Sequence, residues 1–142
     1  MLVEFIGSPY LEGKQDYIES KLRVFLKQLL ESEIGCSLTH TEISNLQVIV
    51  CFDSVITDAC CVRHNTESNK FLIKLSKRSF QMLGNVLAHE LCHVIQMLNG
   101  SLVPILEGDG VVIWKGERFE LSKIKHNKRP WEMEAKSFAY KK

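Results

Sequence analysis

The chain has 142 residues and a formal net charge of +1 at pH 7, with 45% hydrophobic and 25% charged residues. This balance fits one globular domain, 1–142, and gives no overall charge that would indicate nucleic acid or an anionic membrane as a partner. There is no signal peptide, no apolar run of about 20 residues and no CxxC spacing among the five cysteines, so we expect a cytoplasmic protein with reduced thiols and no membrane contact.

The first half of the chain predicts one helix and a small sheet. Residues 1–14 show no regular pattern, because Gly and Pro interrupt them. Over 14–33, apolar residues recur at three- and four-residue steps, which predicts an amphipathic helix that ends at Gly35. Short apolar and β-branched runs predict three strands, at 45–52, 60–62 and 70–76. The last two strands flank a polar turn, which indicates an antiparallel hairpin.

The second half predicts a buried helix, a small hairpin and a C-terminal helix. The run 79–98 contains good helix formers, is apolar nearly all round and ends at Asn99-Gly100, a strong helix stop. A loop follows at 101–110, then two hairpin strands at 111–114 and 117–121, and then a basic connector at 122–129. Pro130 then suits the first turn of a helix that continues over 131–140.

The segment His89-Glu90-Leu-Cys-His93 carries the strongest chemical signal in the chain. Two histidines four apart on a helix lie on one face, so their ring nitrogens can converge on one metal ion. The Glu beside the first His is placed to take a proton from a metal-bound water. The alternative is a core helix in which the two histidines hydrogen-bond to other protein groups. The HExxH spacing favours zinc over this alternative. Zinc would also bind the buried histidines, which need a polar partner.

A hydrolytic zinc site takes three protein ligands and leaves one position for water, so a third ligand must lie outside this segment. The downstream candidates are Glu107, Asp109, His126, Glu132 and Glu134. A second helix packed on the first would aim a carboxylate most rigidly, which favours Glu132 or Glu134. These two point in nearly opposite directions on a helix. Glu132 shares its face with the small residues Ala135 and Ala139, so geometry favours Glu132 without excluding Glu134.

The HExxH segment followed by Glu132-Met-Glu-Ala-Lys-Ser-Phe-Ala139 resembles the gluzincin zinc peptidases, in which HExxH is followed by a helix that carries ExxA. Small cytosolic gluzincins include the ImmA/IrrE-type metallopeptidases and the minigluzincins. The Trp114-Lys-Gly-Glu hairpin and the Pro130-Trp131 helix start are also similar to small phage-encoded HExxH proteins, which would act in a host cytoplasm. The resemblance covers about residues 79–140, and it implies that Glu132, three residues before Ala135, is the third ligand.

Two features depart from this family pattern or compete with it. Many gluzincins carry Asp or Asn directly after that Ala as a partner of a zinc histidine, whereas this chain has Lys136. The partner would then be Glu107, Asp109 or Glu134, or it would be absent. SprT-like DNA-associated proteases use a third His, which makes His126 the rival ligand. The basic residues around it leave nucleic acid as a weakly supported partner.

The resemblance implies an α+β, zincin-like fold. It would comprise an N-terminal helix, a small mostly antiparallel sheet, the buried HExxH helix, a small hairpin and a C-terminal helix bearing the third ligand. One Zn²⁺ per chain would bind His89, His93 and Glu132, with Glu90 activating a zinc-bound water to hydrolyse a protein or peptide substrate. His126 or Tyr140 would stabilise the transition state, and the strand at 70–76 would pair with substrate as an edge strand. The alternatives are a non-catalytic zinc-stabilised binding module and a SprT-like protease.

Overall fold

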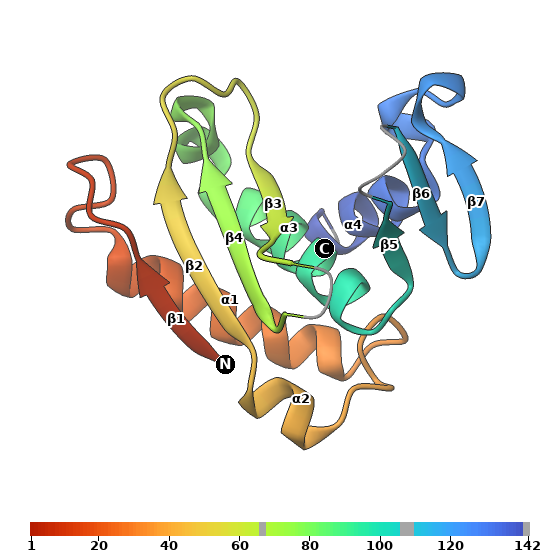
Figure 1. Ribbon diagram of the computed structural model, residues 1–142. Helices are drawn as coiled ribbons and strands as arrows, with labels where there is room; N and C mark the ends of the chain where they lie inside the picture. The colour runs from red at the N-terminus through yellow and green to blue at the C-terminus, as the bar shows by residue number, and fades with distance from the viewer. Residues whose placement is uncertain (66–67, 106–109, 141–142) are drawn as a thin grey trace.

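Within residues 1–65, 68–105 and 110–140, which the computed structural model describes, the chain forms four α-helices and two small β-sheets (Figure 1). The mixed α+β composition that the sequence predicted is therefore present. The first half builds a four-stranded sheet, and the second half adds a three-stranded sheet. A single hydrophobic core collects buried side chains from both halves, including Leu22, Val50, Leu91 and Trp131.

The four-stranded sheet has the order β1-β2-β4-β3, and its strands are β1 (Leu2–Phe5), β2 (Gln47–Phe52), β3 (Cys60–Arg63) and β4 (Lys70–Leu75). β2 pairs in parallel with both β1 and β4, and only the β3–β4 pair is antiparallel. The prediction of a mostly antiparallel sheet is wrong for this sheet, although the β3–β4 hairpin is confirmed. The error has two sources. β1 was not predicted, because four residues ahead of a Gly and a Pro give almost no periodic signal, and β4 rather than β3 lies beside β2.

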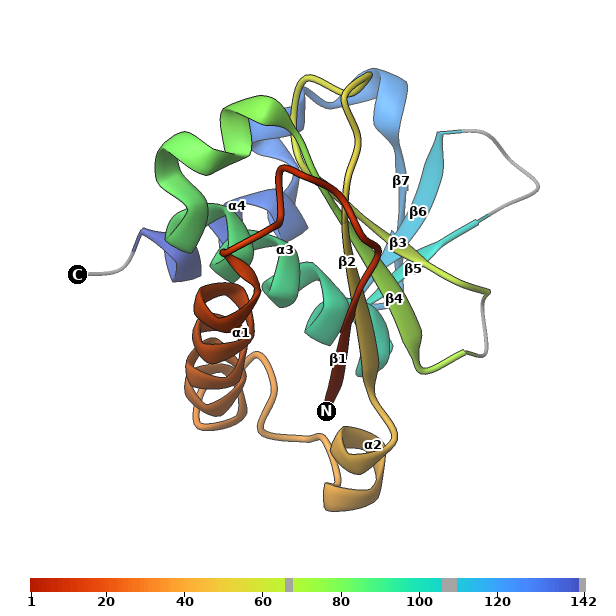
Figure 2. The ribbon, with the colours of Figure 1, turned by 90° about the vertical axis from the view of Figure 1, so that its left-hand side faces the viewer.

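Helix α1 (Gln15–Leu30) makes the parallel arrangement possible, because it forms the crossover between β1 and β2. Its buried residues are Ile18, Leu22, Leu26 and Leu29, which recur at helical spacing as the sequence predicted. α1 and α3 cover one face of the sheet, as Figure 2 shows. The strands turn alternate apolar side chains toward that face, and Val48, Val50, Phe71, Ile73 and Leu75 are fully buried.

A short helix that the sequence analysis did not predict, α2 (His40–Ser44), leads into β2. Its first turn is closed by a capping box: the Thr39 hydroxyl accepts from the Glu42 backbone N–H, and the Glu42 carboxylate accepts from the Thr39 backbone N–H. The Thr-x-x-Glu spacing is a sequence signature of such a start, but five residues are too few to show a helical apolar period.

The predicted helix at 79–98 consists of two pieces. A 3₁₀ segment, η1 (Lys77–Met82), precedes helix α3 (Leu83–Leu98), and Met82 has non-helical backbone angles at the junction. The Ser76 backbone N–H donates to the Ser79 hydroxyl, which holds the first turn. Gly100, with φ of +81°, ends α3 at the predicted position, because glycine adopts this left-handed conformation without strain. From Leu87 onward α3 is almost entirely buried, as its apolar sequence predicted.

The three-stranded sheet consists of β5 (Leu102–Pro104), β6 (Val111–Trp114) and β7 (Glu117–Glu120), and both of its pairs are antiparallel. The β6–β7 hairpin was predicted. Its two-residue turn, Lys115-Gly116, has positive φ at both positions, as this class of turn requires. The connector contains η2 (Leu121–Lys123) and η3 (His126–Lys128), and α4 (Pro130–Ala139) completes the described chain with Pro130 in its first turn.

The five cysteines are free thiols, as predicted, and Cys51 and Cys92 are buried. Among the described residues, every helix is too short or too polar to cross a membrane.

Candidate metal centre

Helix α3 carries three of the predicted site residues, His89, Glu90 and His93. The spacing of four places the two imidazole rings on the same face, with ring centroids 4.7 Å apart and planes at 81°. His93 and Glu90 are buried, whereas His89 is partly exposed. The helix therefore directs two ring nitrogens toward one point, as the HExxH spacing requires.

Helix α4 supplies the third side chain, because it packs tightly on α3. Ala135 is fully buried and Ala139 is nearly so, and their small side chains allow the two helices to approach closely. Two amide side chains fix the packing. The Asn85 amide nitrogen donates to the Ala139 carbonyl at 2.8 Å, and the Gln96 amide nitrogen donates to the Trp131 carbonyl at 3.1 Å. Glu132 is thereby carried to the histidines.

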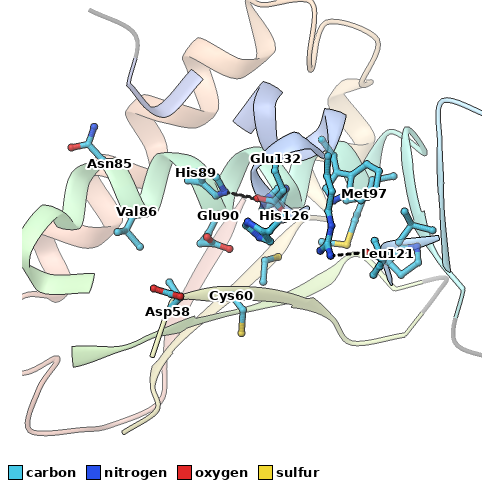
Figure 3. A pocket seen from close by; sticks show the side chains of 18 of the residues that line it. Asp58, Cys60, Asn85, Val86, His89, Glu90, Met97, Leu121, His126 and Glu132 are labelled. Carbon is cyan, nitrogen blue, oxygen red and sulfur yellow. Dashed lines mark hydrogen bonds and ion pairs between the residues drawn. The ribbon is translucent and has the colours of Figure 1, made fainter. Parts of the chain in front are cut away.

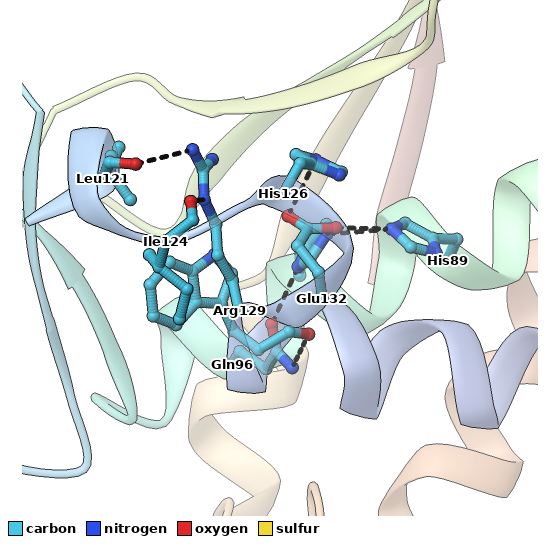
Figure 4. Close-up of polar contacts among 9 residues, drawn as sticks. His89, Gln96, Leu121, Ile124, His126, Arg129 and Glu132 are labelled. Carbon is cyan, nitrogen blue, oxygen red and sulfur yellow. Dashed lines mark hydrogen bonds and ion pairs between the residues drawn. The ribbon is translucent and has the colours of Figure 1, made fainter. Parts of the chain in front are cut away.

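The three donor atoms form a nearly equilateral triangle, and Figure 4 shows the contact between two of its corners, His89 and Glu132. Glu132 Oε1 lies 2.9 Å from His89 Nε2 and 3.1 Å from His93 Nε2. The two Nε2 atoms lie 3.1 Å apart. The structure thus brings His89, His93 and Glu132 together as a group that could hold a metal ion.

This triangle fits the dimensions of a zinc site. Zinc binds imidazole nitrogen and carboxylate oxygen at about 2.0–2.2 Å, and a tetrahedron with such bonds has ligand–ligand edges of about 3.3 Å. The observed separations of 2.9–3.1 Å differ from this by a few tenths of an ångström. Three protein donors also leave one tetrahedral position for a further ligand. The donor set therefore fits zinc, although two imidazoles and one carboxylate suit several divalent transition metals.

Gln96 fixes the tautomer of His93. The Gln96 amide nitrogen lies 3.1 Å from the Trp131 carbonyl and 2.9 Å from Glu134 Oε1, and both of these groups can only accept. The amide oxygen therefore faces His93 Nδ1, at 2.8 Å, and that nitrogen must donate to it. Consequently Nε2 of neutral His93 presents its lone pair to the triangle, which is the state that binds a metal.

The charges of the cluster favour a cation at its centre. Burial alone would raise the pKa of Glu132, but in the metal-free protein the hydrogen bonds that it accepts from His89 and from the protonated form of His93, together with nearby positive charge, hold the pKa well below its ordinary value. Burial would also lower the pKa of His93, but the hydrogen bond and negative charge of Glu132 outweigh it, and the pKa is raised. The ionised carboxylate thus stabilises positive charge beside it, and a metal ion would supply that charge.

The three donors open into a cavity of about 690 Å³ (Figure 3). Glu90, which follows His89 on α3, lines the same cavity and is only 6% exposed. Burial raises the pKa of the Glu90 carboxyl to about 7, against the opposing charges of His93 and His89. A carboxyl with a pKa in this range can both accept and release a proton near neutral pH.

The remaining predicted residues lie in different places. His126 lines the cavity, with Nε2 3.5 Å from Glu132 Oε2, and its side chain is 70% exposed. Tyr140 lines the same cavity and is half exposed. Glu134 lies outside the triangle and contacts Gln96 and Lys115 instead. Glu107 and Asp109 lie outside the described residues.

Neither Gln96 nor Asn85 was singled out from the sequence. A signal for Gln96 existed, because it is the one polar side chain in the apolar run Val94–Leu98 and stands three residues after His93. The sequence analysis predicted that a carboxylate would contact one of the zinc-binding histidines. In the structure Gln96 contacts His93, and the carboxylate of Glu134 contacts Gln96. Lys136 takes no part in these contacts.

The strand at the cavity is β3, not the one predicted. β4 is paired on both sides, so the prediction that 70–76 is an edge strand is wrong. β3 forms the edge of the sheet, and Cys60 and Cys61, with the preceding Asp58 and Ala59, line the cavity. The sequence could not show this, because strand order does not follow chain order here.

Comparisons of the chain with protein-family models, with curated proteins and with solved structures gave no match.

Proposed function

We propose that the protein is a zinc-dependent metallopeptidase of the gluzincin type, with a zincin-like fold, that hydrolyses peptide bonds of a protein or peptide substrate. The observation that carries the proposal is the triangle of His89, His93 and Glu132 donors, with Glu90 beside it on the wall of an open cavity. Bound zinc supplies Lewis acidity, which polarises a carbonyl and lowers the pKa of a coordinated water toward ~7.

Glu90 has the role of proton carrier in this reaction. Its carboxylate accepts a proton from the attacking water, and the same proton then passes to the leaving amine, so that the side chain returns to its starting state. Burial raises the pKa of Glu90 in the metal-free protein, which favours its accepting a proton, and the positive charge of a bound metal would oppose that rise and favour releasing the proton.

His126 and Tyr140 are the candidates for stabilising the oxyanion of the transition state. Both line the cavity that holds Glu90. His126 contacts one of the candidate metal ligands, since its Nε2 is 3.5 Å from Glu132 Oε2. A donor at this position can hydrogen-bond a substrate oxygen as negative charge develops on it.

The outer edge of β3 offers the backbone groups that would hold an extended substrate. The His64 backbone N–H donates to the Lys70 carbonyl, and bonded and non-bonded pairs alternate along an antiparallel ladder. The N–H and C=O groups of Cys61 and Arg63 therefore face away from β4, toward the cavity side. A substrate strand that adds to this edge would run directly past the metal centre.

Two other functions have less support. In a zinc-stabilised binding module, a buried Glu90 beside a site with an open position would have no role, and it would cost stability. A SprT-like DNA-associated protease has less support because the net charge of the chain is only +1, and Lys123 and Lys115 of its basic segment lie near Glu120 and Glu134. Retention on DNA that weakens steeply with salt would favour that function over the one proposed.

The test combines metal analysis with cleavage of a peptide library derived from a whole proteome. We expect one zinc per chain in wild-type protein purified without chelator, and cleavage products that disappear when zinc is removed and return when it is restored. Glu90→Gln should keep its zinc and lose cleavage. Protein that folds but takes up no zinc, or a Glu90→Gln variant that cleaves like wild type, would overturn the proposal.

A further inference from the structure

A second cavity, of about 290 Å³, adjoins the metal centre. It is lined by residues 61–65 of β3 and the following turn, by Met97 of α3, and by Val103 and Pro104 of β5. Cys61, Met97 and Pro104 also line the larger cavity. The two cavities are therefore neighbours that share part of their walls, and both are lined by residues of β3 and β5.

The walls of this second cavity are mostly apolar, and their polar residues are Arg63, His64 and Asn65. Val62 is 43% exposed and Val103 is 42% exposed, and Met97, which also lines the cavity, is buried. Exposed apolar side chains that lie on both sides of one cavity are typical of a binding site.

The one arginine at this cavity is occupied by the protein itself. The Arg63 Nε atom donates to the Ser68 carbonyl at 2.8 Å, and Nη1 donates to the Met97 carbonyl at 3.2 Å. Its guanidinium also lies over the Phe71 ring, 5.3 Å from the centroid. The cavity therefore offers van der Waals contact to a ligand, and its charged side chain is directed into the fold.

The direction of β3 relates this cavity to the metal centre. β3 begins at Cys60, beside the larger cavity, and runs to Arg63, beside the smaller one. A chain that adds to β3 in the more stable antiparallel sense runs the opposite way, from the smaller cavity to the metal. The residues that enter the smaller cavity therefore precede the bond held at the metal.

We infer that the smaller cavity is the specificity pocket of the enzyme, and that it takes a large apolar side chain, such as that of Leu, Ile, Met or Phe, two or three residues before the scissile bond. The inference rests on the proposed function. Its occupant is an extended substrate segment, because the cavity shares Cys61, Met97 and Pro104 with the cavity at the metal centre and lies along the free edge of β3.

Cleavage-site profiling tests this preference. Zinc-loaded wild type should cut the proteome-derived peptide library with apolar residues enriched two or three positions before the cleaved bond, and matched Leu and Ser peptides should differ about tenfold in kcat/KM. Val103→Glu and the milder Val103→Thr should reduce that ratio toward one while zinc content stays at one per chain. Val24→Glu, the same change at an exposed valine on α1, is the control and should keep the wild-type ratio.

Cleavage without this enrichment, or with enrichment unchanged in Val103→Glu, overturns the inference and leaves the proposed peptidase function standing. Absence of any cleavage counts against the peptidase function instead, and the pocket is then tested by binding. In zinc-loaded Glu90→Gln, N-acetyl-leucine amide should shift the methyl NMR signals of Val103 and Met97, whereas N-acetyl-aspartate amide should not. Equal or absent shifts for the two probes also overturn the inference.

Discussion

The Gln96 amide oxygen accepts a hydrogen bond from His93 Nδ1 at 2.8 Å, while the amide nitrogen of the same side chain donates to two groups on α4. One fully buried amide thus sets the protonated nitrogen of a histidine in the candidate metal centre and also joins the helix that carries Glu132. The geometry of the candidate metal centre and the packing of α3 on α4 therefore depend on the same residue.

Replacing Gln96 with Met should weaken zinc binding by about 10- to 100-fold, because it removes the acceptor that orients His93 and leaves the Trp131 carbonyl without its amide donor. The dissociation constant can be measured by competition with a fluorescent zinc chelator. Gln28→Met, at an exposed position of α1, makes the same chemical change away from the site and should bind zinc like wild type. Equal zinc affinity in both variants would contradict the assigned role of Gln96.

Glu132 and Glu134 should differ sharply in their effect on the metal. Glu132→Ala removes one corner of the donor triangle, so we expect zinc to be lost on dialysis against a weak chelator. Glu134→Ala and His126→Ala leave the triangle intact and should retain zinc under the same dialysis. Inductively coupled plasma mass spectrometry measures the metal per chain. Loss of zinc from His126→Ala with retention in Glu132→Ala would instead identify His126 as the third ligand.

In the metal-free protein, the contribution of buried Glu90 to the free energy of unfolding should depend on pH. Its pKa is raised from an unfolded value of 4.5 to about 7 by burial, so the protonated form stabilises the fold. That stabilisation is complete below pH 4.5 and is lost as the pH rises through 7. Glu90→Gln mimics the neutral form at every pH.

The difference in unfolding free energy between metal-free Glu90→Gln and metal-free wild type should therefore grow in favour of the variant by roughly 3 kcal/mol between pH 4 and pH 8. Urea denaturation in the presence of chelator measures it. A difference that stays constant over this interval would show that burial does not raise the pKa of Glu90.

The close approach of α3 and α4 should be sensitive to side-chain size at Ala135, which is fully buried between them. Ala135→Leu should lower the free energy of unfolding by about 1–3 kcal/mol, because the added atoms have no room, and it should also weaken zinc binding by displacing Glu132. Thermal unfolding with and without zinc measures both effects. Met133→Leu, at an exposed position of the same helix, is the control and should change neither.

The sequence by itself determined the chemistry of the site. The spacing of His89 and His93 places both rings on one helical face wherever that helix packs, and the apolar run around them required the helix to be buried. Periodicity likewise predicted α1, the β3–β4 and β6–β7 hairpins and α4, because each of these depends on residues close together in the chain.

Only the tertiary structure decided how these elements meet. β1 is too short to carry a pattern, and its parallel pairing with β2 depends on contacts more than forty residues apart in the chain. For the same reason, the position of β3 at the sheet edge could not be read from local spacing, and spacing favoured Glu132 over Glu134 without excluding Glu134. The choice of ligand follows from the packing of α4 on α3 through Ala135, Asn85 and Gln96, since a helix presents a given side chain to a neighbour only after its docking angle and register are fixed.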